Sequence, residues 1–93
     1  MTSKIAVVTG ASSGIGLLST MELAKDGFFV VATMRDLGRR QRLDEAAKAA
    51  GVQDKIEFRQ LDVTQFASLP DAVAGIVRNH QRIDVLLNNA GFS

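Results

Sequence analysis

The sequence contains no cysteine and no tyrosine, and it has a single histidine. Without cysteine the chain has neither a disulfide nor a thiolate metal site. His80 has no second histidine or cysteine with which to share a metal ion. Its place at the end of a predicted helix indicates either a solvent-exposed side chain or a favourable contact with the helix dipole, rather than catalysis. No apolar run approaches the roughly 20 residues that a membrane-spanning helix needs, so we expect no membrane partner.

The charge balance excludes a further class of partner. Eleven basic and ten acidic residues leave a formal net charge of +1, so the chain as a whole does not attract nucleic acid. The first four residues lead directly into a short apolar strand and do not resemble a signal peptide, and we therefore expect a cytoplasmic protein. With 46% hydrophobic residues, the 93 residues predict one folded domain, residues 1–93.

A glycine-rich turn, Thr9–Gly16, follows the first apolar strand directly and is the most informative segment of the chain. Gly10 allows the chain to turn sharply, because a residue without Cβ accepts backbone angles that other residues resist. Gly14 keeps side-chain bulk away from a bound phosphate, and Gly16 lets the following helix lie close to the sheet. The N-terminus of that helix presents unpaired N–H groups to an anion. The glycines run G-x-x-x-G-x-G rather than G-x-G-x-x-G, and the turn predicts a site for a nucleotide pyrophosphate.

Short apolar runs alternate with helical patterns along the whole chain, which predicts an α/β fold. We expect strands over residues 4–9, 28–33, 55–61 and 83–87, and helices over residues 14–25, 37–50 and 69–79. The order β-α-β-α-β-α-β predicts a Rossmann-type parallel sheet with strand order 3-2-1-4. Right-handed crossovers place the first two helices on one face and the third on the other. A ligand should bind where the turn after the first strand meets the end of the fourth.

Side-chain patterns refine these elements. Gly27 and Gly51 are placed to end the first two helices, and Ser68 is a candidate N-cap for the third. Asp84 is expected to begin the fourth strand without a chemical role. The apolar surface of the first helix should come from five residues, Ile15, Leu18, Met21, Leu23 and Ala24.

Three motifs in this order resemble the short-chain dehydrogenase/reductase family. They are the Thr9–Gly16 turn, the pair Asp62-Val63 after the third strand and the segment Asn88–Gly91 after the fourth. The stretch Ala32–Leu37 is also similar to the NADP-preferring steroid and retinol dehydrogenase-like members. The resemblance covers essentially the whole chain and implies the cofactor-binding N-terminal half of the family's domain, truncated at its C-terminal end.

The resemblance also implies which residues bind the cofactor. Asp62 would lie beside the adenine ring and accept from its exocyclic amine, while Val63 would offer a backbone N–H. The segment Asn89–Gly91 would line the cofactor's adenosine and its nicotinamide-side ribose. Taken alone, however, Asn-Asn-Ala-Gly is also compatible with a simple turn. The full set of candidate cofactor-binding residues is Gly10, Ser12, Ser13, Gly14, Ile15, Gly16, Arg35, Asp62, Val63, Asn89, Ala90 and Gly91.

The end of the second strand favours NADP(H) over NAD(H). NAD-binding domains place an acidic residue about 20 residues beyond the glycines to hold the ribose 2′-hydroxyl. We assign that position to Thr33, followed two residues later by Arg35, which can pair with a 2′-phosphate through two charge-assisted hydrogen bonds. Ser13 can add a hydroxyl donor. The alternative is that Arg35 is a solvated residue, with Asp36 as its partner or as the N-cap of the next helix. Three further arginines are expected on a solvated helix face: Arg39, Arg40 and Arg42.

The catalytic part of the resembled family is not found in these 93 residues. In that family a Tyr-x-x-x-Lys pair and a serine after the Asn-Asn-Ala-Gly segment carry out proton transfer, and this chain has no tyrosine. The fourth strand should also form an exposed apolar edge. We therefore expect either a further C-terminal half or self-association through that strand. Three hypotheses remain: part of an NADP(H)-dependent oxidoreductase acting on an alcohol or carbonyl by hydride transfer, a nucleotide-binding module without catalysis, and a fragment that only self-associates.

Overall fold

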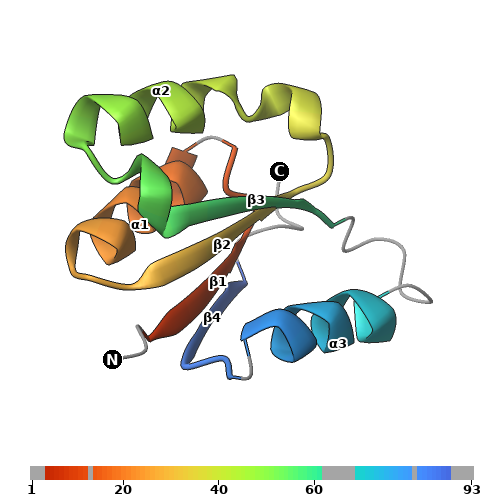
Figure 1. Cartoon of the computed structure of the whole chain (residues 1–93). Helices are drawn as coiled ribbons and strands as arrows, with labels where there is room; N and C mark the ends of the chain where they lie inside the picture. Colours follow the sequence, from red (N-terminus) through yellow and green to blue (C-terminus); the bar gives the residue numbers. More distant parts are fainter. Residues whose placement is uncertain (1–3, 13, 62–68, 81, 89–93) are drawn as a thin grey trace.

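Four parallel strands form one sheet in the order β3-β2-β1-β4, as the sequence predicts (Figure 1). In the computed structural model, which describes residues 4–12, 14–61, 69–80 and 82–88, the strands are β1 (Ile5–Thr9), β2 (Phe29–Met34), β3 (Ile56–Gln60) and β4 (Val85–Asn88). β1 lies in the centre, where Val8 pairs with Ala32 of β2 on one side and with Leu87 of β4 on the other. Strands covered on both faces read as continuous apolar runs, which accounts for the composition of β1 and β2.

The helices cover both faces of the sheet, also as predicted. α1 (Gly14–Lys25) and α2 (Gln41–Ala50) lie on one face, and α3 (Leu69–His80) lies on the other (Figure 1). Two short 3₁₀ turns, η1 (Leu37–Arg39) and η2 (Gln53–Lys55), precede α2 and β3. Gly27 and Gly51 both follow a helix with positive φ, 98° and 72°, so both predicted helix ends are confirmed.

Buried apolar side chains lie on both faces of the sheet. The α1/α2 face holds a cluster of twelve buried residues, among them Leu43 of α2 and Met21 of α1. On the α3 face the described buried residues are Ile5, Val7, Val31 and, from α3 itself, Ile76. Apolar burial on both faces therefore stabilises the described fold.

The residues expected to supply the apolar surface of α1 do not all lie on its buried face. Met21 and Ala24 are buried, whereas Ile15 and Leu18 are 70% and 64% exposed. The buried face of α1 consists of four residues at helical spacing, Gly16, Thr20, Met21 and Ala24. Three of these are small, so α1 lies close to the sheet, and Leu17 and Leu23 pack partly buried against the same core.

The single helix predicted over residues 37–50 is interrupted near its start. Asp36 accepts a hydrogen bond from the Gly38 N–H through its side-chain Oδ1 (2.9 Å), which closes the tight turn of η1. Helical i→i+4 hydrogen bonding begins only when the Asp44 N–H donates to the Arg40 carbonyl (2.9 Å). Asp36 is thus an N-cap, as one of the alternatives held, but it caps a 3₁₀ turn.

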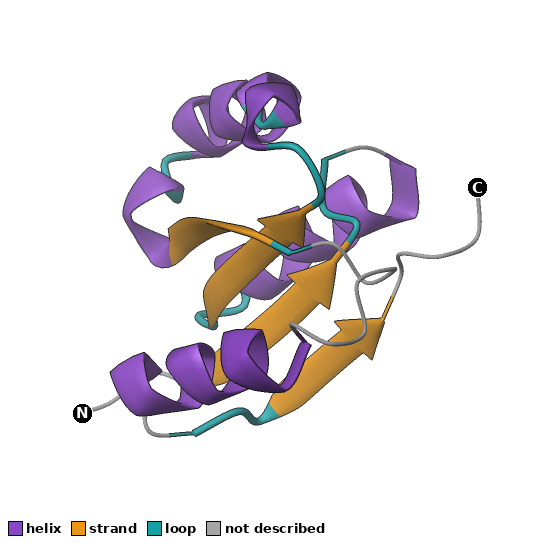
Figure 2. Cartoon of the chain, turned by 90° about the vertical axis from the view of Figure 1, so that its right-hand side faces the viewer, coloured by secondary structure: helices purple, strands orange, loops and turns teal. Residues whose placement is uncertain are grey.

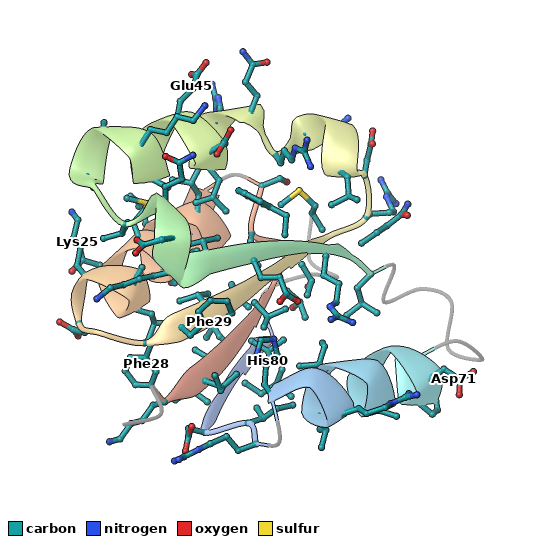
Figure 3. The ribbon with its side chains drawn as sticks, in the orientation of Figure 1. Lys25, Phe28, Phe29, Glu45, Asp71 and His80 are labelled. Atoms are coloured by element: carbon teal, nitrogen blue, oxygen red, sulfur yellow. The ribbon has the colours of Figure 1, made fainter. Side chains whose placement is uncertain are left out.

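His80 does not lie in solvent, which was one of the two alternatives that the sequence left open. Its side chain is 15% exposed, and it turns from the end of α3 toward the sheet (Figure 3). Nε2 of His80 lies 3.1 Å from Oε1 of Glu57 on β3, and the ring lies 5.1 Å from the ring of Phe29 on β2. His80 therefore helps to hold the end of α3 against the sheet.

Asp84 precedes β4 rather than beginning it, and it has a structural role that the sequence did not indicate. Its Oδ2 accepts from the Ile5 N–H (2.7 Å), and its own N–H donates to the Ile5 carbonyl (2.8 Å). Arg82 donates a short hydrogen bond to the other carboxylate oxygen. Asp84 consequently fastens the start of β1 to the segment that leads into β4, 79 residues further along the chain.

This contact predicts a pH-dependent loss of stability. The hydrogen bonds from Arg82 and from the Ile5 amide lower the pKa of the Asp84 carboxyl. A carboxyl whose pKa is lower in the folded state adds stability above its unfolded pKa, about 4, and that stability is lost as the pH falls through the folded pKa. We expect Asp84→Asn to lower the melting temperature at pH 7, and the difference from the unaltered chain to shrink below about pH 4. Thermal unfolding followed by circular dichroism at several pH values measures this. Asp54→Asn, at an exposed carboxylate, is the control, and a pH-independent difference for Asp84→Asn would contradict the assignment.

Candidate cofactor-binding site

The glycine turn and Arg35 lie at the same edge of the sheet because they follow neighbouring parallel strands. The turn leaves the carboxyl end of β1, and Arg35 follows Met34, the last residue of β2. The strand arrows point in a common direction (Figure 2). In open α/β sheets ligands bind outside the carboxyl ends of the strands, next to the point where the strand order reverses. Here that point lies between β1 and β4, where Thr9 pairs with Asn88.

The backbone of the turn adopts the conformations that the sequence predicted. Gly10 and Gly14 have φ values of 65° and 60°, a region in which residues with a side chain are disfavoured. α1 begins at Gly14, so its first N–H groups have no partner within the helix. Gly16 is buried where α1 approaches the sheet. The turn therefore combines a sharp change of direction with a helix N-terminus.

The space in front of this helix N-terminus fits an anionic group. A Cβ built at Gly14 meets no atom within 4 Å, so the position faces open space. A pyrophosphate needs unpaired N–H groups and freedom from side-chain bulk, and a helix N-terminus also supplies partial positive charge. The described residues meet these requirements for the phosphates of a dinucleotide.

Arg35 is exposed and free to pair with an anion. Among the residues that the structure describes, no carboxylate forms an ion pair with its guanidinium, and Asp36, the partner proposed in the alternative, bonds Gly38 instead. The Arg35 carbonyl accepts from Nε2 of Gln60 on β3 (3.1 Å), which fixes the backbone at the strand end. Arg35 is thus a cation on a fixed backbone position beside the glycine turn.

Thr33 does not occupy the position that the sequence analysis gave it. β2 extends one residue further than predicted, to Met34, and Thr33 is fully buried within it. Its Oγ1 donates to the Val8 carbonyl (3.0 Å), and its own carbonyl accepts from the Ala11 N–H (3.0 Å). A threonine within an apolar run was the only sequence signal for these contacts. The first exposed residue beyond β2 is Arg35, so among the described residues the 2′-phosphate interpretation rests on Arg35.

Arg39, Arg40 and Arg42 are exposed, as expected for a solvated face. Arg40 packs its guanidinium 5.9 Å from the centre of the Phe58 ring, a cation–π contact that holds the start of α2 over β3. It also lines an open hollow with Asp44, whose carboxylate offsets the positive charge there. This hollow is less suited to a phosphate than the turn beside Arg35.

Several predicted site residues cannot be placed. Ser13, the pair Asp62-Val63 and the segment Asn89–Gly91 lie outside the described residues. Ser12, in the glycine turn, is half-buried, and Ile15, in the first turn of α1, is exposed. Among the described residues, no group of three histidine, cysteine, aspartate or glutamate side chains is arranged to hold a metal ion. No helix in the described part of the chain is long and apolar enough to cross a membrane.

Comparison with known proteins gives consistent relatives. The chain is 46% identical over 91 residues to the uncharacterized oxidoreductase YusZ of Bacillus subtilis, covering 98% of this chain and 32% of that protein. Among solved structures it resembles menthone neomenthol reductase from Mentha piperita, at 36% identity and a TM-score of 0.82, covering 99% of this chain and 33% of that one. It also resembles a metagenomic short-chain oxidoreductase in complex with NADP, at 35% identity and a TM-score of 0.86, with coverages of 99% and 41%.

The chain spans about a third of the length of the curated relatives it matches. Those relatives are oxidoreductases, and some of the solved structures hold NADP or NADPH. The family described as short chain dehydrogenase matches residues 4–93, which includes the glycine turn and every described strand and helix. The sheet order and the placement of the turn are those that the sequence motifs predicted. The chain belongs to the short-chain dehydrogenase family.

Proposed function

We propose that this chain is the NADP(H)-binding N-terminal part of an oxidoreductase that acts on an alcohol or carbonyl group by hydride transfer. The observation that carries the proposal is the juxtaposition of Gly14, which faces open space at the start of α1, with the exposed Arg35 at the adjoining strand end. Solved relatives with bound NADP or NADPH support this choice of cofactor.

In this proposal the described residues bind and orient the cofactor. The unpaired N–H groups at the start of α1 would hold the pyrophosphate, and Arg35 would pair with the 2′-phosphate. When bound, the cofactor supplies the nicotinamide ring that gives or accepts hydride. The 93 residues contain no tyrosine, so we assign the proton transfer of the family's reaction to no residue of this chain.

A fluorescence titration of the purified chain with NADPH and with NADH tests the proposal. We expect a saturable signal with NADPH and tighter binding than for NADH, because only NADPH carries the phosphate that Arg35 can contact. Tighter binding of NADH would reject the assigned preference. A nucleotide-binding module without catalysis would give the same titration result. The titration therefore tests cofactor binding, and it does not distinguish such a module from part of an oxidoreductase.

A self-associating chain is a second candidate, and the exposure of β4 favours it. Leu86 on β4 is 64% exposed. An open groove of about 390 Å³ also runs between α1 and β4, and its lining residues are Leu18, Ser19, Glu22, Leu23, Asp26, Val85 and Leu87. Unpaired apolar edges of this kind pair readily with another strand. A second copy of the chain or the additional chain that the longer relatives have would cover this surface.

We expect the average mass of the chain in sedimentation equilibrium to rise with concentration. Leu86→Lys should raise the dissociation constant of the dimer about tenfold or more, because it removes an apolar side chain worth about 1.5–3 kcal/mol when buried. Ala50→Lys changes the charge equally at an exposed position on α2 and should leave self-association unchanged. A monomer at every concentration would reject the second candidate.

A further inference from the structure

Thr33 forms hydrogen bonds on both sides of Gly10, one to the end of β1 and one to the glycine turn. Its hydroxyl donates to the carbonyl of Val8, two residues before Gly10, and its carbonyl accepts from the N–H of Ala11, one residue after Gly10. Both distances are 3.0 Å, and both Thr33 and Ala11 are fully buried. The paired register of β1 and β2 ends at Val8 and Ala32, so these two hydrogen bonds continue the connection between the strands beyond the ladder.

Thr33 precedes Arg35 by two residues. Thr33 still belongs to the ladder between β2 and β3, where it pairs with Arg59, and the next residue, Met34, is 2% exposed. The backbone from Thr33 to Arg35 is therefore held on the β3 side by strand pairing and by the hydrogen bond from Gln60 to the Arg35 carbonyl. A hydrogen-bonded segment thus links the glycine turn at one end to the Arg35 backbone at the other.

We infer that Thr33 is a positioning residue that sets the distance between the glycine turn and Arg35, and so governs the preference for NADPH over NADH. This inference rests on the cofactor site proposed above. NADPH must contact the glycine turn and Arg35 at the same time. A small displacement of either the turn or Arg35 therefore weakens the charge-assisted hydrogen bonds to its phosphates. NADH uses the turn alone, so it is less sensitive to the spacing.

The hydroxyl is the part of Thr33 that a substitution can remove without changing its shape. Thr33→Val keeps the branched side chain and the strand preference but deletes the donor to Val8. We expect Thr33→Val to weaken NADPH binding about fivefold to tenfold, which corresponds to a partial loss of one charge-assisted hydrogen bond between Arg35 and the 2′-phosphate, and NADH binding less than about twofold. Thr33→Ser retains the hydroxyl and should restore most of the preference.

A second variant separates positioning from general destabilisation. Ile76→Val, on the α3 face, removes one buried methylene far from the turn and provides a control of similar stability loss. It should leave the ratio of NADPH to NADH affinity unchanged. In an Arg35→Gln background, Thr33→Val should lower both affinities by the same factor, because the contact that depends on the spacing is already lost. Thr33→Ala supplies a second variant without the hydroxyl if the valine variant does not fold.

The experiment is a calorimetric titration of each variant with NADPH and with NADH separately. A selective loss of NADPH affinity in Thr33→Val, recovered in Thr33→Ser, supports the inference. Equal losses for both nucleotides, or a loss no larger than that of Ile76→Val, overturns it while leaving the proposed cofactor site intact. Failure of the unaltered chain to bind either nucleotide rejects both the site and the inference.

Discussion

Gly14→Val should weaken NADPH binding by about 100-fold or more, because it places side-chain bulk where the pyrophosphate meets the start of α1. The Cβ of any residue at this position points into the open space that we assign to the phosphates. Displacing the phosphates removes about two hydrogen bonds to a charged group, each worth about 1.5–3 kcal/mol, which corresponds to at least a ~100-fold loss of affinity. The measurement is the NADPH dissociation constant of the variant by fluorescence titration.

Gly51→Val is a closely matched control for this experiment. Gly51 has φ 72°, against 60° for Gly14, and a Cβ built there also meets nothing within 4 Å. Both substitutions therefore impose a similar backbone strain, about 1–2 kcal/mol. Gly51 follows α2, however, and lies outside the proposed site. Both variants should melt at a lower temperature, but only Gly14→Val should lose NADPH binding. Equal loss of binding in the two variants would show that folding, and not the phosphate site, is affected.

Arg35→Asp should lower the affinity for NADPH about 100-fold and the affinity for NADH by less than about threefold. The substitution removes a bidentate partner of the 2′-phosphate and places a negative charge against it. NADH carries a hydroxyl at the same position, and this hydroxyl can donate a hydrogen bond to a carboxylate. The ratio of the two dissociation constants, measured in the same buffer, is the quantity that changes.

The control for Arg35→Asp carries the same change of charge at another exposed arginine. Arg42 lies in α2 and is not part of the proposed site. Arg42→Asp should leave the ratio of NADPH to NADH affinity unchanged, since exposed charges beyond about 10 Å are screened at ordinary salt concentrations. A parallel loss of NADH affinity in Arg35→Asp would mean that Arg35 contributes to folding rather than to the choice of cofactor.

The sequence was sufficient to predict the architecture because local signals and the global fold agree. Alternating apolar runs and glycine-ended helical patterns gave the strand order, and the parallel arrangement then placed the glycine turn beside Arg35. The break before α2 was missed, since it depends on the hydrogen bond from the Gly38 N–H to Asp36, which competes with helical hydrogen bonding in a segment otherwise suited to a helix.

The contacts that the sequence could not predict join residues far apart in the chain. His80 is held by Glu57, 23 residues earlier, and a lone histidine at a helix end gives no sign of that partner. The hydroxyl of Thr33 meets the Val8 carbonyl across 25 residues, and only the register of β1 and β2 brings them together. The structure places the glycine turn and Arg35 at the carboxyl edge of the sheet, as the sequence predicted, whereas the hydrogen bonds of Thr33 became visible only in the structure.

The most direct test of the account is an NMR titration of the ¹⁵N-labelled chain with NADPH. The account predicts that the largest amide shift changes fall at Gly10, at the start of α1 and at Arg35, and that they saturate together with a single dissociation constant. NADH should reproduce the changes at Gly10 and α1 but not those at Arg35. Changes confined to other parts of the sheet, or no saturable change at the glycine turn, would contradict the account.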